Sequence, residues 1–510
     1  MLARARTFTI EGLHARAVTV EVDIRPGLPA FAIVGLADAA VREARDRVHA
    51  AVLNSGYEFP ARRITANLAP ADVPKIGPGF DLALACGVLA ASGQIPSNLL
   101  DTHALFGELS LDGEIRATHG TLAVAEATMK AGLRMLVLGP ARAREAMLVE
   151  GLEIGIVERL TSAVRVLGGG AGDTPPGQHR ASRQRTTQAQ LDLGDVRGQS
   201  DAVRALRIAA AGAHNSLLSG PPGTGKTMLA QRLPSILPPL ERSEAIEVMR
   251  IHSVTGRLGG GEELPHERPF RAPHHSITTA GLIGGARRGW VGEVVLAHNG
   301  VLFLDELSEF SRPTLEALRQ PLEDGRVAIV RAQHSAVYPA RFMLIAATNP
   351  CPCGHAGEQE RCRCSEADLA RHRRRLSGPL LDRIDLLVNV ERAAVDHLSD
   401  EPSLTSAQAR EHVMEARERQ AARLRAEGIL VNAQMDARML RTYAKLSSSG
   451  EMLFARSLER GLLSARGQHR VLRVARTVAD LDRSEQVEAE HLARAFSLRS
   501  EAGLSSRWAA

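Results

Sequence analysis

The chain has 510 residues, enough for two or three domains, and its formal net charge of +5 is compatible with a polyanionic partner without requiring one. Hydrophobic residues make up 44% and charged residues 24%, as in soluble globular proteins, and four of the five cysteines lie in one short segment, which excludes a secreted disulfide scaffold. The first six residues lack the apolar core of a signal peptide and no apolar run could span a bilayer, so we expect a cytoplasmic protein without a membrane partner.

Residues 1–168 are expected to form a first domain of mixed strands and helices. Alternating or short apolar runs indicate the strands, and apolar residues at helical spacing indicate the helices. Strands are expected at 18–24, 31–35, 64–68, 105–109, 115–116 and 135–138, and helices at 38–53, 82–91 and 122–131. Asp112-Gly113 predicts the turn of a hairpin. The mixture predicts an α/β or α+β domain.

Three motifs in this domain resemble landmarks of the proteolytic domain of Lon-type proteases. They are Pro74–Gly79, Asp112–Ile115 and Gly120–Ala123. The resemblance implies a nucleophilic serine where this chain has Gly79, and an activating lysine where it has Ala123. Because neither residue offers a nucleophile or a titratable group, the resemblance implies a Lon-like fold without protease activity. We interpret Lys75 as a solvated loop residue rather than a binding residue.

A stretch rich in Gly, Pro, Ser, Arg and Gln at 169–194 separates this domain from the rest of the chain. It has no apolar period, so we interpret it as a flexible linker. Residues 195–392 are expected to form an α/β core, and 393–510 a helical lid with Arg-rich faces.

The most specific motif is a phosphate-binding loop. Its residues are Gly220, Pro221, Pro222, Gly223, Thr224, Gly225, Lys226 and Thr227, which match G-x-x-x-x-G-K-[ST] without a mismatch. Backbone amides and the following helix N-terminus are expected to bind the phosphates of ATP. Lys226 is expected to contact the β- and γ-phosphates, and the Thr227 hydroxyl to ligate Mg²⁺. The alternative, a chance Gly/Pro turn, is disfavoured because an apolar strand precedes the loop and a helix follows it.

Two later apolar strands end in residues suited to ATP hydrolysis. The run 300–304 ends in Asp305 and Glu306. Carboxylates at the end of a buried parallel strand lie beside the phosphates, so we expect Asp305 in the Mg²⁺ shell and Glu306 polarising the attacking water. The run 342–348 ends in Asn349, which fits a sensor that positions this water. A strand-ending Asn in a proline turn is the alternative.

Arg383 is the candidate for an arginine finger. In a ring ATPase, an arginine of the next subunit completes the site and contributes about 10³–10⁵ in rate. Arg383 lies between two aspartates in the run 380–386. A structural Asp–Arg pair is the alternative.

The chain resembles the YifB/ComM family, in the magnesium-chelatase-like, helix-2-insert branch of AAA+ ATPases. The motifs that support this are 268–276, 292–298 and 349–354. The resemblance spans nearly the whole chain, including the inactive Lon-like domain. It implies a hexameric ATPase, and it implies that ComM-like members drive branch migration of DNA during natural transformation. Replicative helicases of the MCM type share the branch.

Two further groups of residues gain candidate roles from this resemblance. Residues 325–338 read as a β-hairpin that points into the ring's channel in the resembled branch, where Arg331, Gln333 and His334 could contact a DNA backbone. A solvated turn is the alternative. AAA+ lids also place an arginine against the nucleotide, for which Arg466 is the first candidate and Arg470 the second. A surface position on an amphipathic helix is the alternative.

The cysteine pairs indicate a structural metal site. Cys351, Cys353, Cys362 and Cys364 form two C-x-C pairs around a short polar loop. Four thiolates can bind one tetrahedral Zn²⁺, and no position is evident for a catalytic water. Four reduced thiols are the alternative, and His355 is a possible substitute ligand. Cys86 lies in an apolar helix and is expected in the core.

The sequence therefore predicts a P-loop AAA+ core with a helical lid, preceded by a Lon-protease-like α+β domain. We expect a homo-oligomer, most simply a hexamer, that hydrolyses Mg²⁺-ATP and acts on DNA as a ComM-like helicase. Three alternatives belong to other classes: a magnesium-chelatase-type chaperone that remodels a metal-insertion partner, an ATP-dependent protease, and a non-hydrolysing scaffold. Gly79 and Ala123 disfavour the protease. The scaffold is disfavoured by the full set of Lys226, Asp305, Glu306 and Asn349.

Overall fold

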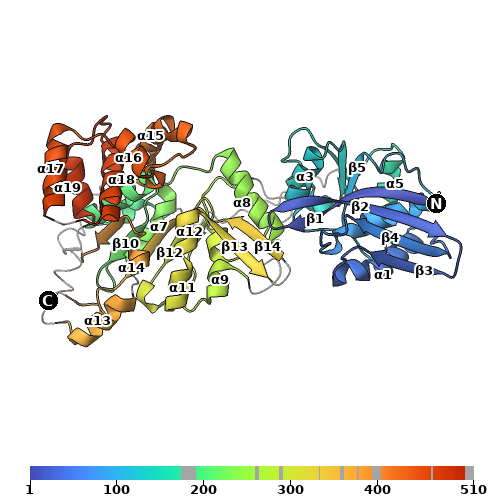
Figure 1. The fold of residues 1–510 in the computed structure, drawn as a ribbon, viewed down its shortest axis with the longest axis horizontal. Coiled ribbons are helices and arrows are strands. Elements are labelled where there is room, and N and C mark those ends of the chain that lie inside the picture. The colour runs from blue at the N-terminus through green and yellow to red at the C-terminus, as the bar shows by residue number, and fades with distance from the viewer. Residues whose placement is uncertain are drawn as a thin grey trace. The chain divides into compact units, whose positions relative to one another are not determined.

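The computed structural model describes residues 1–173, 191–258, 264–285, 291–331, 334–356, 361–375, 378–392, 404–460 and 463–499. These residues form two compact units (Figure 1). The first contains the described residues of 1–184 and of 242–265, and the second those of 185–241 and of 266–510. Among the described residues, no helix combines the length and the apolarity that crossing a membrane requires.

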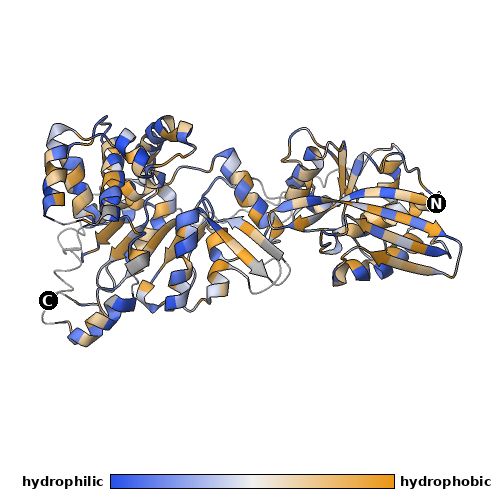
Figure 2. Ribbon diagram, in the orientation of Figure 1, coloured by the Kyte–Doolittle hydropathy of each residue, from blue (hydrophilic) through white to orange (hydrophobic). Residues whose placement is uncertain are grey.

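The first unit contains a mixed seven-stranded sheet with the order β3-β4-β2-β1-β5-β8-β9. Its strands are β1 (Leu2–Glu11), β2 (His14–Arg25), β3 (Ala30–Val34), β4 (Arg63–Ala69), β5 (His103–Phe106), β8 (Met135–Leu138) and β9 (Glu153–Ile156). β1 and β9 were not predicted. In β1, small Ala3 and Ala5 face the core between arginines, so the alternation lacks the large apolar residues that mark a strand. Figure 2 shows the resulting alternation of polar and apolar residues along β1 and β2.

Helices cover the sheet of the first unit. They are α1 (Ala39–Asn54), α2 (Asp81–Ala91), α3 (Thr121–Lys130), α4 (Ala143–Ala146) and α5 (Leu160–Leu167). Every residue of α2 is buried, including Cys86, as predicted, because α1, α5 and the sheet surround it. The short strands β6 (Glu108–Leu109) and β7 (Ile115–Arg116) form the predicted hairpin around Asp112-Gly113.

Helix α8 (Arg242–Val254) belongs to the first unit, although the predicted boundaries assign it to the ATPase core. It packs on α3, where Leu122, Met249 and Leu258 form a buried apolar cluster. Polar contacts also connect α8 to the rest of the first unit. Arg250 donates to Glu126 at 2.6 Å, and Ser253 donates to the buried Glu145 at 2.7 Å. The insert that follows the phosphate-loop helix is therefore built into the Lon-like unit.

The second unit contains a parallel five-stranded sheet with the order β11-β12-β15-β10-β16. Its strands are β10 (Ser216–Ser219), β11 (Phe270–Arg271), β12 (Val301–Leu304), β15 (Met343–Thr348) and β16 (Leu386–Asn389). The central strands β10, β12 and β15 are buried throughout, as continuous apolar runs predict for a parallel sheet. Their carboxyl ends meet at one edge, which is where α/β sheets bind ligands.

The described residues of the sheet-containing part also form helices and a hairpin. The helices are α6 (Ser200–Gly212), α7 (Lys226–Ile236), α9 (Thr279–Ile283), α10 (Glu293–Leu296), α11 (Arg312–Ala317), α12 (Arg319–Asp324), α13 (Glu366–Arg375) and α14 (Gly378–Leu381). The hairpin consists of β13 (Arg326–Arg331) and β14 (His334–Pro339), which pair antiparallel as predicted.

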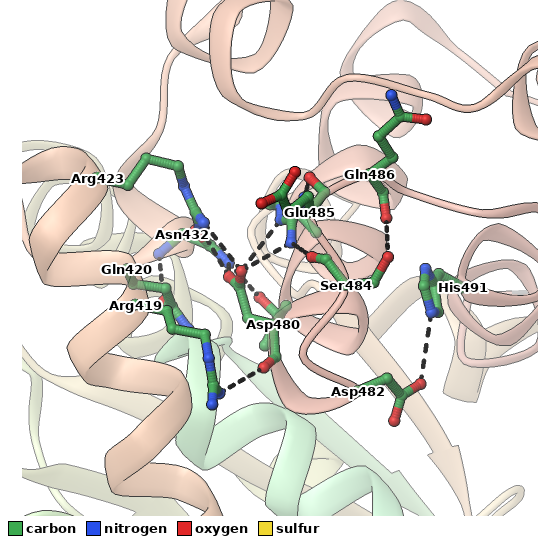
Figure 3. A network of polar contacts seen from close by, with 12 residues as sticks. Arg419, Gln420, Arg423, Asn432, Asp480, Asp482, Ser484, Glu485, Gln486 and His491 are labelled. Atoms are coloured by element: carbon green, nitrogen blue, oxygen red, sulfur yellow. Dashed lines mark hydrogen bonds and ion pairs between the residues drawn. The ribbon is translucent and has the colours of Figure 1, made fainter.

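The lid is helical, as predicted. Its helices are α15 (Ser406–Leu424), α16 (Ala437–Tyr443), α17 (Ser448–Glu459), α18 (Ala465–Leu481) and α19 (Ala489–Ser497). Asp436 caps α16 by accepting the amide of Met439 at 2.8 Å. Buried Asp480 joins the lid elements by accepting hydrogen bonds from Arg423, Arg476 and Asn432 (Figure 3).

Candidate ATP-hydrolysing site

The phosphate loop connects β10 to α7 in the second unit, as the motif predicts. Gly225 caps α7 with φ +87°, a conformation that residues with a Cβ rarely adopt. At Gly220 a Cβ would lie 2.1 Å from the carbonyl oxygen of Val390, so no larger residue fits without a shift of the backbone. The loop is therefore a close-packed cradle of backbone groups at a helix N-terminus, which suits phosphate binding.

The Lys226 side chain lies inside this cradle. Its Nζ donates to the carbonyl oxygens of Gly220 at 2.7 Å and Pro221 at 2.8 Å, and to Oδ1 of Asn349 at 3.1 Å. Burial lowers the pKa of Lys226, while Asp305 and Glu306 act in the opposite direction. The predicted sensor and the phosphate-loop lysine are thus in direct contact.

Thr227 and Asp305 lie together as the sequence predicts. The Thr227 hydroxyl donates to Oδ2 of Asp305 at 2.7 Å. A hydroxyl and a carboxylate oxygen are hard ligands of the kind that Mg²⁺ prefers. These two side chains therefore fit the role of Mg²⁺ ligands beside the phosphate loop.

Glu306 is held in an unusual backbone conformation next to Asp305. Its φ and ψ are both 51°, in the left-handed region, and its amide donates to Oδ1 of Asp305 at 2.9 Å. Its carboxylate Oε2 lies 3.1 Å from Nδ1 of His275. Sequence reasoning assigned no role to His275, although the residue lies in a motif that carried the family resemblance. The histidine orients the carboxylate that is predicted to polarise water.

Asn349 has a second partner that the sequence did not reveal. Its backbone oxygen accepts a hydrogen bond from Nε2 of His372 at 2.9 Å. His372 is buried in α13, and burial lowers its pKa. His372 lies within a basic run, residues 371–375, so one member of this run is buried and contacts the predicted sensor.

The two predicted arginines, Arg383 and Arg466, are linked through Asp382, the residue that precedes Arg383. Arg383 pairs with Glu323 of α12, and Asn215 donates to the Arg383 backbone oxygen at 3.0 Å. Arg466 lies at the N-terminus of α18, 3.8 Å from Asp382, the residue before Arg383. Its rival Arg470 also lies near this aspartate, at 3.7 Å. Asp382 therefore draws the lid arginines toward the candidate finger.

The four clustered cysteines lie together at the end of β15. Their sulfur atoms all lie within 4.8 Å of one another, and none forms a disulfide. Burial raises the pKa of Cys351 to about 12. At Cys353 burial acts in the same direction, but backbone amides of His355 and Arg363 donate to the sulfur and the pKa falls to about 6. The donor set fits one tetrahedral thiophilic cation.

Comparison with known proteins identifies the family. The family models described as magnesium chelatase subunit ChlI, subunit ChlI of Mg-chelatase, and the C-terminal part of magnesium chelatase subunit ChlI match residues 192–398, 20–142 and 403–499. The protein YifB of Escherichia coli is 43% identical over 495 residues, and the competence protein ComM of Haemophilus influenzae is 42% identical over 496 residues. Each alignment covers 96% of this chain and 95% of the relative.

The chain belongs to the YifB/ComM family of magnesium-chelatase-like AAA+ ATPases. An uncharacterised protein of Mycobacterium tuberculosis is 44% identical over 98% of both chains. Two further relatives match only part of this chain. Lon protease 2 of Bacillus subtilis is 29% identical over 182 residues, and the DNA replication licensing factor Mcm6 of Drosophila melanogaster is 26% identical over 220 residues. They cover 31% and 41% of this chain.

In the Lon-like unit of this YifB/ComM protein, Gly79 and Ala123 occupy the two positions where the resemblance implies a catalytic serine and lysine. A Cβ on Gly79 would lie 2.4 Å from the ring of Phe106, so a serine would require that ring to move. Ala123 is buried in α3. The interpretation of Lys75 as a solvated residue is wrong, because its side chain is buried and donates to the backbone oxygen of Pro70. Burial lowers the pKa of Lys75.

Two of the three predicted DNA-contacting residues, Arg331 and His334, lie in the strands of the YifB/ComM hairpin. Arg331 pairs with His334 in the last register position of β13 and β14. Gln333 lies outside the described residues. The strand pairing places Arg331 and His334 opposite each other on the hairpin, and their role in binding DNA stays a prediction.

Proposed function

We propose that this chain is a cytoplasmic, ATP-driven ring motor that translocates on DNA and promotes branch migration. The contact between Thr227 and Asp305 carries the ATPase part of the proposal, because it brings a phosphate-loop hydroxyl and a strand-end carboxylate to one point. The DNA part is supported by the name of the Haemophilus relative, a competence protein, and by the partial similarity to a DNA replication licensing factor.

The residues of one subunit divide the work of hydrolysis. The phosphate loop and Lys226 bind the phosphates of ATP, and Thr227 and Asp305 hold Mg²⁺, which neutralises charge on the phosphates. Glu306 accepts a proton from the attacking water, and His275 fixes the direction of its carboxylate. Asn349, which contacts Lys226, orients the same water from the neighbouring strand.

A neighbouring subunit completes the site in this proposal. Arg383 acts as the finger that stabilises charge in the transition state, and Arg466 acts beside it. The short chain of contacts from Arg466 to Asp382 and then along the backbone to Arg383 supports treating the two as one group. Because the proposed finger acts in the site of the next subunit, the proposal requires a homo-oligomer, most simply a hexamer.

The hairpin tip is the proposed contact to DNA. Arg331, Gln333 and His334 offer donors for phosphate oxygens, and only 3% of the chain is aromatic, so base stacking contributes little. Binding through phosphates is independent of sequence and weakens as the salt concentration rises.

One assay tests the proposal. The ATPase rate of the full chain is measured with and without forked and four-way DNA across a salt series. We expect stimulation by DNA that declines with salt, no turnover in Lys226→Ala, and nucleotide binding without hydrolysis in Arg383→Ala. Full turnover in Lys226→Ala would refute the site.

The family models favour one second candidate, a chaperone of the magnesium-chelatase type that remodels a metal-insertion partner. The same ATP site would drive it. DNA would then leave the ATPase rate unchanged at every salt concentration, while Lys226→Ala would still be inactive.

A further inference from the structure

The cysteine cluster adjoins the ATP site, and this proximity has a physical basis in three elements. Cys351 follows Asn349 by two residues at the end of β15. The loop then passes Pro222 of the phosphate loop, and Cys364 leads into α13, which carries His372. The cluster therefore lies between the sensor, the phosphate loop and the helix that bonds back to the sensor.

The sulfur positions match a tetrahedral tetrathiolate site. A Zn–S bond of about 2.3 Å implies a separation of about 3.8 Å between sulfur atoms at the corners of a tetrahedron. The sulfur atoms lie 3.4 Å apart in Cys351 and Cys353, 4.0 Å apart in Cys351 and Cys362, and 3.8 Å apart in Cys353 and Cys362. The amide of Ala356 also donates to the Cys351 sulfur at 3.2 Å, which supports a thiolate at this position.

The described part of the loop offers little apolar surface to hold this arrangement by itself. Among the described residues, the buried apolar cluster around it consists of Ala356 and Leu369 together with the cysteines themselves. One leucine and one alanine give little hydrophobic stabilisation compared with the entropy lost by ordering the loop. A metal ion that binds all four thiolates supplies the missing free energy, as in small zinc-dependent modules.

The phosphate loop is packed directly against the cysteine loop. Gly354 has φ +85°, and a Cβ there would lie 2.4 Å from Cδ of Pro222. The Gly354 amide donates to the Cys351 oxygen at 2.9 Å, so its position is fixed by the same turn that contains two of the thiolates. On the other side, Nε2 of His372 donates to the backbone oxygen of Asn349 at 2.9 Å.

We propose that the four cysteines bind one structural Zn²⁺ and that this metal module holds the phosphate loop and Asn349 in register. The ion exchanges for the thiol protons, with no change of oxidation state and no open position for substrate. It acts on turnover only by fixing Gly354 against Pro222 and His372 against Asn349. The effect on ATPase activity depends on the proposed function, whereas metal binding does not.

Metal content tests the site independently of activity. The full-length protein is analysed for zinc, iron and acid-labile sulfide, and zinc is then replaced by Co²⁺ to record the absorption of a tetrahedral thiolate complex. We expect one zinc per chain, loss of the metal in Cys362→Ser and Cys364→Ser, and full retention in Cys86→Ala. Metal-free protein with four reactive thiols would overturn the site, and so would an iron–sulfur cluster.

Substitutions at two glycines test whether the metal module affects ATP turnover, without changing any of the four cysteines. Gly354→Ala is expected to keep its zinc and to lower kcat about tenfold or more, because small displacements of catalytic groups have large effects on rate. Gly428→Ala is the control, since Gly428 also has a positive φ of +76° but nothing lies within 4 Å of a Cβ there. Equal kcat values for the two variants, each with bound zinc, would overturn the coupling while leaving the metal site and the ATPase proposal intact.

Discussion

The Thr227 hydroxyl lies 2.7 Å from the Asp305 carboxylate, although 78 positions of the sequence separate the two residues. The parallel sheet brings these two residues together, because β15 pairs with both β10 and β12 and aligns their carboxyl ends. Thr227 follows β10 through the phosphate loop, and Asp305 follows β12 directly. The contact therefore joins the phosphate loop to the residues that follow β12.

Asp305→Asn should remove the negative charge of this side chain while keeping its hydrogen bond with the Thr227 hydroxyl. The amide oxygen can still accept the Thr227 hydrogen bond, but the negative charge that attracts Mg²⁺ is lost. We expect kcat for ATP to fall by about 10²–10³ and the Mg²⁺ concentration for half-maximal activity to rise. An ATPase titration with Mg²⁺ measures both quantities, and an unchanged Mg²⁺ dependence would contradict the assigned role.

His275→Ala tests whether the histidine positions Glu306. We expect kcat to fall by about tenfold with little change in KM, because the carboxylate remains but is no longer oriented. Glu306→Gln should abolish hydrolysis and keep nucleotide binding. The comparison variant is His274→Ala, which loses a ring neighbour of His275 but no contact to Glu306 and should have the smaller effect. If His274→Ala is the more damaged variant, the contact with Glu306 is not the relevant one.

These residues show what the sequence could and could not predict. The phosphate loop, Asp305, Glu306 and Asn349 are recognisable because each occupies a fixed place in a strand, loop or helix start. His275 and His372 were missed because their roles come from contacts across the fold, and neither is marked by local periodicity. Family resemblance had included His275 in a motif, but only the structure gives it a partner.

Domain boundaries show the same limit. The amphipathic helix at 242–254 has the same sequence pattern whether it packs on the ATPase core or on the first unit, because the pattern shows that one face is buried but not which neighbour buries it. The Lys75 interpretation failed for a related reason, because its burial and its contact with the backbone oxygen of Pro70 come from the folded loop and leave no mark in the local sequence pattern.

The Asp81–Arg47 pair predicts a pH dependence of stability in the first unit. Burial raises the pKa of Asp81 to about 6 despite the hydrogen bonds from Arg47, compared with 3.8 for an unperturbed side chain. The folded state therefore binds more protons at Asp81 than the unfolded state does between these values, so the contribution of Asp81 to stability is fully present below about pH 4 and is lost as the pH rises through 6. The change amounts to about 3 kcal/mol at most.

Asp81→Asn isolates this contribution, because an amide does not titrate. The free energies of unfolding of both proteins are measured from pH 4.5 to 7 by urea denaturation with hydrogen exchange of the first unit. The difference, wild type minus variant, should become less favourable to the wild type as the pH rises. A difference independent of pH would contradict the raised pKa.

Met249→Ala tests whether α8 is an integral part of the Lon-like unit. Met249 is 1% exposed in the cluster with Leu122 and Leu258, so truncation should leave a cavity and cost about 2–5 kcal/mol. Met452, which is 60% exposed in the lid, is the matched control, and Met452→Ala should change stability by no more than about 0.5 kcal/mol. Hydrogen exchange locates the effect. Faster exchange in α3 is expected because α3 forms the other side of the cluster, whereas faster exchange confined to β10 and β15 would mean that the helix stabilises the ATPase sheet instead.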